Sequence, residues 1–151
     1  MSKRILMVCL GNICRSPLAE GIFDHHLAQK GFEIDSAGTS GHHQGEKPDQ
    51  RSVATAQKFG IDIADQRSRP FQFSDFDTFD YIFVMDKSNL RNIMTIARSE
   101  EDKKKVSLIM DLTERKGEEV PDPYYGGDHG FDQVFYMLDD ACKAFIKKNN
   151  I

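Results

Sequence analysis

One stretch near the start of the chain decides its fold, and it reads Ile5-Leu6-Met7-Val8-Cys9-Leu10-Gly11-Asn12-Ile13-Cys14-Arg15-Ser16-Pro17. Residues 5–9 form a continuous apolar run, which is typical of a strand that is buried on both faces. Pro17 is favoured at the first position of a helix, because the N–H that proline lacks would be unpaired there anyway. This stretch therefore predicts a strand, a tight loop and a helix.

The remainder of the chain repeats this alternation without a linker that would divide it. Further strands are predicted at residues 32–37, 80–85 and 106–110. Apolar side chains at helical spacing predict helices at residues 18–27, 53–59, 90–97 and 131–146. Strands that alternate with helices indicate an α/β fold with a parallel sheet, here a single domain over residues 1–151. The loops after the strands should meet at one edge of the sheet, where ligands bind in such folds.

Composition excludes several classes of protein. The chain has 151 residues and a formal net charge of −4, which argues against general nucleic-acid binding. Its apolar run near the N-terminus is too short for a signal peptide or a membrane span. Three cysteines are too few for a disulfide framework and fit a reducing compartment, so we expect a cytoplasmic protein that does not act on membranes.

The loop between the first strand and helix contains a cysteine, five residues, an arginine and a serine. Five residues can curl the backbone N–H groups around one anion, and the following helix adds the positive end of its dipole. Gly11 and Asn12 tolerate the bend, while Arg15 offers a planar fork to two phosphate oxygens. A thiolate at Cys9 would be stabilised by these groups and by Ser16. A cysteine at a strand end is more often a core thiol, but its neighbours here favour a nucleophile.

A second cluster follows the fourth strand, in the long loop at residues 111–130. Asp122 stands between two prolines that fix the backbone around it, and Tyr124 and Tyr125 follow. A carboxylic acid could protonate the oxygen that leaves a phosphate ester, and the tyrosines could form the wall of a cleft for an aromatic ring. The alternative is an ordinary surface turn.

Residues 9–17 together with residues 122–126 resemble the low-molecular-weight protein tyrosine phosphatases. Other similar stretches are residues 1–29, 35–39, 49–51, 79–90 and 131–145. The resemblance implies a four-stranded parallel sheet flanked by helices, a doubly wound flavodoxin-like fold. It also implies cytoplasmic hydrolysis of protein phosphotyrosine and aryl phosphates, without a metal or other cofactor. We expect a tyrosine-phosphorylated protein as partner, and a monomer or weak self-association.

The family's functional residues match individual positions. Cys9 corresponds to the nucleophile, Arg15 to the phosphate clamp and transition-state stabiliser, and Asp122 to the general acid that later becomes the base. The remaining positions of the phosphate-binding loop are Leu10, Gly11, Asn12, Ile13, Cys14 and Ser16. Ser36 corresponds to a residue that supports the loop, and the substrate cleft would be formed by His42, Tyr124 and Tyr125.

Two positions depart from the family pattern. Gln66 stands where members often have a histidine in the network behind the loop, and His42 stands where many have an aromatic residue such as tryptophan. Gln66 can form hydrogen bonds but cannot ionise. We expect these departures to change the kinetics or substrate preference.

Adjacent histidines such as His25 and His26 suggest a metal site, but no cysteine or carboxylate stands at a spacing typical of metal ligands beside them.

Three alternative functions remain. An arsenate reductase on the same fold would need further cysteines, and the only later one, Cys142, falls on the apolar face of the last helix. A protein arginine phosphatase would have threonine where this chain has Ile13. A phosphotyrosine-binding pseudoenzyme would lack the acid or the nucleophile.

We also expect Cys14 to capture an oxidised Cys9 as a disulfide.

Overall fold

The computed structural model describes residues 3–125 and 128–151, and its elements alternate as the sequence predicts. The four strands are β1 (Lys3–Cys9), β2 (Phe32–Gly38), β3 (Tyr81–Val84) and β4 (Val106–Leu108). The helices are α1 (Arg15–Leu27), α2 (Gln50–Lys58), α3 (Asp75–Thr78), α4 (Lys87–Ile96), α5 (Glu100–Lys104) and α6 (Asp128–Lys148), with short 3₁₀ turns η1 (Ala28–Lys30), η2 (Ile109–Leu112) and η3 (Pro123–Tyr125). The strands are parallel in the order β2-β1-β3-β4, which confirms the predicted α/β fold.

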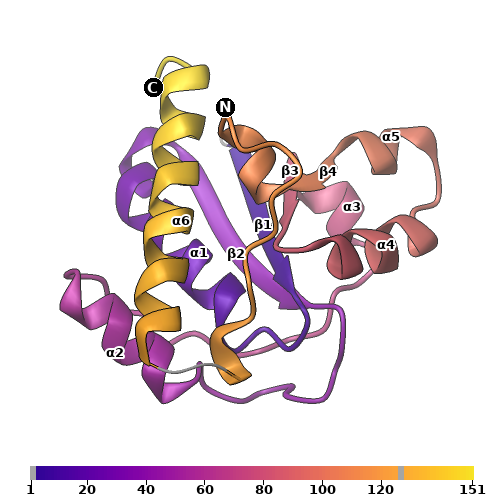
Figure 1. Ribbon diagram of the computed structural model, residues 1–151. Coiled ribbons are helices and arrows are strands. Elements are labelled where there is room, and N and C mark those ends of the chain that lie inside the picture. Colours follow the sequence, from indigo (N-terminus) through magenta and orange to yellow (C-terminus); the bar gives the residue numbers. More distant parts are fainter. Residues whose placement is uncertain (1–2, 126–127) are drawn as a thin grey trace.

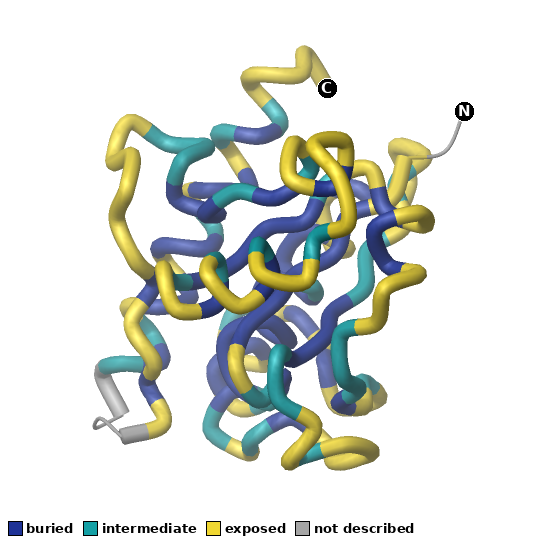
Figure 2. Tube along the Cα trace, turned by 90° about the vertical axis from the view of Figure 1, so that its right-hand side faces the viewer, coloured by how far each residue is buried: buried dark blue, intermediate teal, exposed yellow. Residues whose placement is uncertain are grey.

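Helices cover both faces of the sheet (Figure 1). Side chains of β1 alternate between two apolar clusters, since successive residues of a strand point to opposite faces. Met7 packs in the cluster that holds α1 and α6, whereas Val8 packs in the cluster that holds α3 and α4. The sheet is consequently buried on both sides, and exposed residues gather on the outer turns (Figure 2). This burial explains why the sequence of β1 contains a continuous apolar run.

The loops that follow the strands meet at the carboxyl edge of the sheet, opposite the end marked N in Figure 1. Backbone hydrogen bonds join them: the N–H of Thr39 donates to the carbonyl of Cys9 at 2.9 Å, and that of Asp49 donates to the carbonyl of Ile13 at 2.7 Å. The N–H of Val120 reaches the carbonyl of Met85 at 2.9 Å. The first two bonds attach distant segments to the loop that contains residues 9–15, and the third attaches the segment before Asp122 to the residue after β3.

Several element boundaries differ from the prediction by a few residues, and three of these differences lie in segments that follow strands. β4 ends at Leu108, because Ile109 and Met110 turn into η2 and fill the core on the α6 side. α1 begins at Arg15, so that Pro17 is its third residue, still within the turn that needs no N–H partner. The predicted loop at residues 111–130 contains η3 and the start of α6. Among the described residues no helix has both the length and the apolarity that crossing a membrane requires.

Candidate active site

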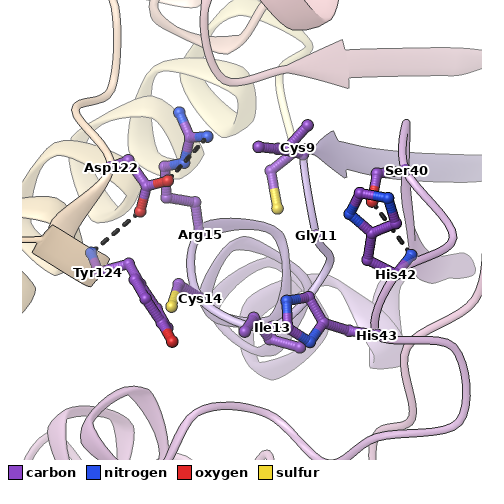
Figure 3. Close-up of a pocket in the computed structure, with 11 residues that line it drawn as sticks. Cys9, Gly11, Ile13, Cys14, Arg15, Ser40, His42, His43, Asp122 and Tyr124 are labelled. Carbon is purple, nitrogen blue, oxygen red and sulfur yellow. Dashed lines mark hydrogen bonds and ion pairs between the residues drawn. The ribbon is translucent and has the colours of Figure 1, made fainter.

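The loop between β1 and α1 encloses a cavity of about 200 Å³ at the carboxyl edge of the sheet (Figure 3). Asn12 has a φ of 57°, in the left-handed region that asparagine tolerates better than most residues. The chain thereby turns back so that α1, which is 13 residues long, begins beside the cavity. Of the predicted site residues, those that line the cavity are Cys9, Leu10, Gly11, Ile13, Cys14, Arg15, His42, Asp122 and Tyr124.

Behind the cavity, a chain of hydrogen bonds runs from the sulfur of Cys9 into the protein. Cys9 Sγ lies 3.0 Å from Ser16 Oγ, and Asn12 Nδ2 donates to Ser16 Oγ at 2.8 Å and to Ser36 Oγ at 2.9 Å. Because Ser16 Oγ accepts from the amide, its own hydrogen is free to donate to the sulfur. Such a donor stabilises a thiolate.

The chain of hydrogen bonds ends at Glu20, a residue that the sequence analysis missed. Ser36 donates its hydroxyl hydrogen to Glu20 Oε1 at 2.6 Å. Burial raises the pKa of the Glu20 carboxyl to about 7, and the bond from Ser36 only partly opposes this. Glu20 lies four residues after Ser16, one turn along α1, and this spacing is the signal that could have pointed to it.

Gln66 does not join this chain of hydrogen bonds. Its Nε2 donates to the carbonyl of Pro17 at 3.1 Å, and its buried Oε1 has no partner among the described residues. The backbone N–H of Arg69 instead donates to Asn12 Oδ1 at 3.1 Å. The side chain of Gln66 therefore contacts the first turn of α1, whereas the backbone of Arg69 supports the phosphate-binding loop through Asn12.

Arg15 is almost completely buried and is held on one side by a carboxylate. Its Nη1 donates to Asp86 Oδ2 at 2.6 Å and to the carbonyl of Val120 at 3.0 Å. Burial disfavours the charge of Arg15, but Cys9 and Asp86 outweigh it, so the pKa of Arg15 is raised. Asp86 was not predicted, although it is the second residue after β3 and caps α4. The guanidinium is thereby fixed at the cavity in a charged state.

Asp122 lies at the mouth of the cavity, on the side of η3. Its Oδ2 is 3.8 Å from Arg15 Nη2, and its Oδ1 accepts a hydrogen bond from the N–H of Tyr124 at 3.0 Å (Figure 3). Tyr124 is 43% exposed, and its ring centroid lies 5.3 Å from the guanidinium carbon of Arg51. The side chain of Tyr125 lies outside the part of the chain that the structure describes.

The opposite wall of the cavity contains two histidines. His42 was predicted there, and its N–H donates to Ser40 Oγ at 3.1 Å. His43, which was not predicted, lines the same cavity and pairs with Glu46 at 2.7 Å. A Cβ on Gly11 would lie 2.9 Å from His43 Cδ2, so the glycine allows this imidazole to cover the loop.

The other two cysteines occupy different environments. Burial, reinforced by the charge of Asp49, raises the pKa of Cys14 to about 12. Cys142 is fully buried among the apolar side chains of α1 and α6, as its place on the helix predicted. Among the described residues, no three histidine, cysteine, aspartate or glutamate side chains gather as a metal site. The cavity thus combines a thiol, a fixed cation and a carboxyl group around a space for one oxyanion.

Comparisons with known proteins agree with this geometry. The sequence model of the family described as Low molecular weight phosphotyrosine protein phosphatase matches residues 4–150. A low molecular weight phosphotyrosine protein phosphatase of Schizosaccharomyces pombe is 41% identical over 150 residues, 95% of either chain. A crystal structure of a protein tyrosine phosphatase from Entamoeba histolytica superposes with a TM-score of 0.90 at 43% identity, covering 99% of this chain and 97% of that one. The structure of a Drosophila arginine phosphatase has a TM-score of 0.89 at 30% identity, covering 97% and 98%. The chain belongs to the low molecular weight phosphotyrosine protein phosphatase family, a family of hydrolases.

Proposed function

We propose that this protein hydrolyses phosphotyrosine in proteins, and aryl phosphates, through a phosphocysteine formed on Cys9. The observation that carries this function is the placement of Cys9 Sγ, 3.0 Å from Ser16 Oγ, in a cavity that Arg15 and Asp122 also line. A phosphate bound by the loop N–H groups would place its phosphorus above the sulfur. The three free thiols suit a reducing compartment, which supports a cytoplasmic location.

In the first step, the thiolate of Cys9 attacks phosphorus and the bond from phosphorus to the phenolic oxygen breaks. Asp122 gives its proton to that oxygen, which leaves as a neutral phenol. Arg15 and the loop N–H groups stabilise the charge on the three equatorial oxygens. The product of this step is a phosphocysteine and an ionised Asp122.

In the second step, a water molecule attacks the phosphocysteine. Asp122, now ionised, accepts a proton from this water while the sulfur–phosphorus bond breaks. The electrons of that bond return to Cys9 as a thiolate, which the hydroxyl of Ser16 stabilises. Inorganic phosphate then leaves and the starting state of the enzyme is restored.

The shape of the cavity favours an aromatic substrate over phosphoarginine. Its walls include the apolar side chain of Ile13 and the ring of Tyr124, both suited to stack on or enclose a flat ring. A guanidinium group would instead need polar partners for its N–H groups. The similarity to an arginine phosphatase at 30% identity shows a shared fold, so the choice between the two substrates depends on these walls.

Turnover of p-nitrophenyl phosphate in the presence of a chelator tests the proposed hydrolysis. We expect release of nitrophenol by the native protein and none by Cys9→Ser, which should still bind vanadate because Arg15 and the loop N–H groups remain. Parallel assays with phosphotyrosine, phosphoserine and phosphoarginine peptides should show the highest kcat/KM for phosphotyrosine. Folded protein without turnover, or near-normal rates for Cys9→Ser, would contradict the assignment.

A further inference from the structure

A second hollow, of about 800 Å³, adjoins the catalytic cavity. The two share three lining residues, Ile13, His43 and Tyr124. In Figure 3, Ile13 lies at the bottom of the view between Tyr124 on one side and His43 on the other. An elongated ligand held by its phosphate in the catalytic cavity can therefore continue between these two side chains into the second hollow, named here the flank groove.

The two carboxylates that line the flank groove are both engaged by ion-pair partners, whereas two of its cations are not within the described part of the chain. Of its charged residues, Glu46 pairs with His43 at 2.7 Å, and Asp49 pairs with Arg51 at 3.1 Å. Lys47 and Arg67 also line the groove and are exposed. Among the described side chains, which leave out those of residues 1–2 and 125–129, neither Lys47 nor Arg67 has an ion-pair partner.

Arg67 is held in place even without a carboxylate. Its Nη1 donates to the carbonyls of Ala64 at 3.1 Å and Gln66 at 2.7 Å. These bonds fix one edge of the guanidinium and leave the other edge to bind an anion. Because the side chain is already held, binding costs less rotamer entropy than it would for a mobile side chain. The lining of the flank groove also includes the buried Pro48 and the half-buried Val53, which suit the apolar parts of an extended peptide.

We propose that the flank groove binds the residues next to the phosphotyrosine of a substrate protein, and that Lys47 and Arg67 select acidic side chains there. This specificity rests on the proposed phosphatase function, because the phosphate in the catalytic cavity anchors the peptide. Continuity between the two hollows identifies the occupant as the same chain that carries the phosphotyrosine. The two cations without an ion-pair partner identify its preferred neighbours as aspartate or glutamate.

Peptide kinetics test this specificity. The substrates are phosphotyrosine peptides of one length that carry glutamate, glutamine or lysine at the flanking positions, on either side of the phosphotyrosine in separate peptides. For the native protein, kcat/KM should be roughly 3–30-fold higher with glutamate than with glutamine on one side, the range that two surface ion pairs give. Added salt should reduce this ratio, because exposed charges are screened.

A double charge reversal with a matched control locates the effect. Lys47→Glu combined with Arg67→Glu should abolish or invert the preference for glutamate over glutamine. The control combines Lys30→Glu with Lys104→Glu, which changes the net charge by the same amount. These two lysines lie just before β2 and β4, at the opposite edge of the sheet. This control should keep the native ratio.

The results that would overturn the flank groove differ from those that would overturn the phosphatase function. Native protein that hydrolyses p-nitrophenyl phosphate but shows no preference among the flanking residues would overturn the flank groove alone. A preference that survives the double reversal, or that the control loses equally, would also overturn it. Absence of turnover with every substrate by folded protein would instead overturn the phosphatase function itself.

Discussion

Two carboxylates lie beside the one guanidinium of the site, and their distances give them different roles. Asp86 is 2.6 Å from Arg15 and is fixed as the cap of α4, so it positions the cation. Asp122 is 3.8 Å away, at the more exposed mouth of the cavity. A carboxyl group that is only loosely paired can exchange its proton with a leaving group or with water, as the proposed mechanism requires of Asp122.

Replacing Asp122 should slow the chemical step selectively. We expect Asp122→Ala to lower kcat by roughly 10²–10⁴-fold for phenyl phosphate, which is the usual contribution of a general acid. The loss should shrink for substrates such as p-nitrophenyl phosphate, whose leaving group needs less protonation. Steady-state kinetics across a series of substituted phenyl phosphates measures this dependence. An equal loss for every leaving group would argue against proton donation by Asp122.

Cys14 sits in the same loop as Cys9 and should respond to oxidation. Peroxide is expected to convert Cys9 to a sulfenic acid, which Cys14 then captures as a disulfide. Because burial raises the pKa of Cys14 to about 12, this capture should be slow near neutral pH and faster as the pH rises. Mass spectrometry should find a loss of two hydrogens that a thiol reductant reverses. Irreversible inactivation without that product would refute the expectation.

At the scale of elements, the end of β2 sets the position of the phosphate-binding loop. The last residue of β2 is Gly38, which pairs with Cys9 in the sheet. A Cβ at this position would lie 2.8 Å from the carbonyl oxygen of Leu10 and 3.0 Å from that of Ser40. Both contacts are with backbone, so only movement of the loop could accommodate a side chain.

Gly38→Ala should therefore displace the phosphate-binding loop. We expect a loss of about 1–3 kcal/mol of stability from overpacking and a fall of roughly 10–100-fold in kcat/KM, because small displacements of catalytic groups are costly. Gly41→Ala is the matched control, since among the described residues no atom beyond its two chain neighbours lies within 4 Å of a Cβ there. Equal behaviour of the two variants in urea unfolding and turnover would contradict this role of Gly38.

The sequence predicts the contiguous part of the site better than its distant supports. The strand, the loop and α1 could be inferred because their signals lie within a few residues of one another. Arg15 and Asp86 are 71 positions apart, and their contact depends on β3 lying next to β1, which local patterns do not determine. The short α3 was likewise not predicted, because four residues carry too little periodicity.

At the scale of the whole molecule, the burial of Glu20, where the chain of hydrogen bonds behind the cavity ends, makes stability depend on pH. An exposed glutamate has a pKa of about 4.5, and burial raises the pKa of Glu20 to about 7. Carboxylates of Asp35 and Asp24 add to the rise, whereas Arg69 opposes it. Between these two pH values the folded protein keeps a proton that the unfolded chain has released, so the free energy of unfolding decreases as the pH rises.

Glu20→Gln should remove this contribution while leaving an oxygen to accept the hydrogen bond from Ser36. Relative to the native protein, the variant should gain roughly 1–3 kcal/mol of stability between about pH 5 and about pH 8. Urea unfolding at both pH values measures the difference. Glu114→Gln, at an exposed position, should not change the pH dependence. A parallel pH dependence of Glu20→Gln and native protein would show that Glu20 does not titrate in this range.

The formation of a phosphocysteine on Cys9 is the central claim, and rapid-quench mass spectrometry during turnover of an aryl phosphate tests it most directly. Acid quenching within the first turnovers should trap a phosphoryl group on the peptide that contains Cys9, and Asp122→Ala should change how much accumulates. Phosphate release without any phosphorylated peptide, or a phosphoryl group trapped on another residue, would contradict the assignment of Cys9 as the nucleophile.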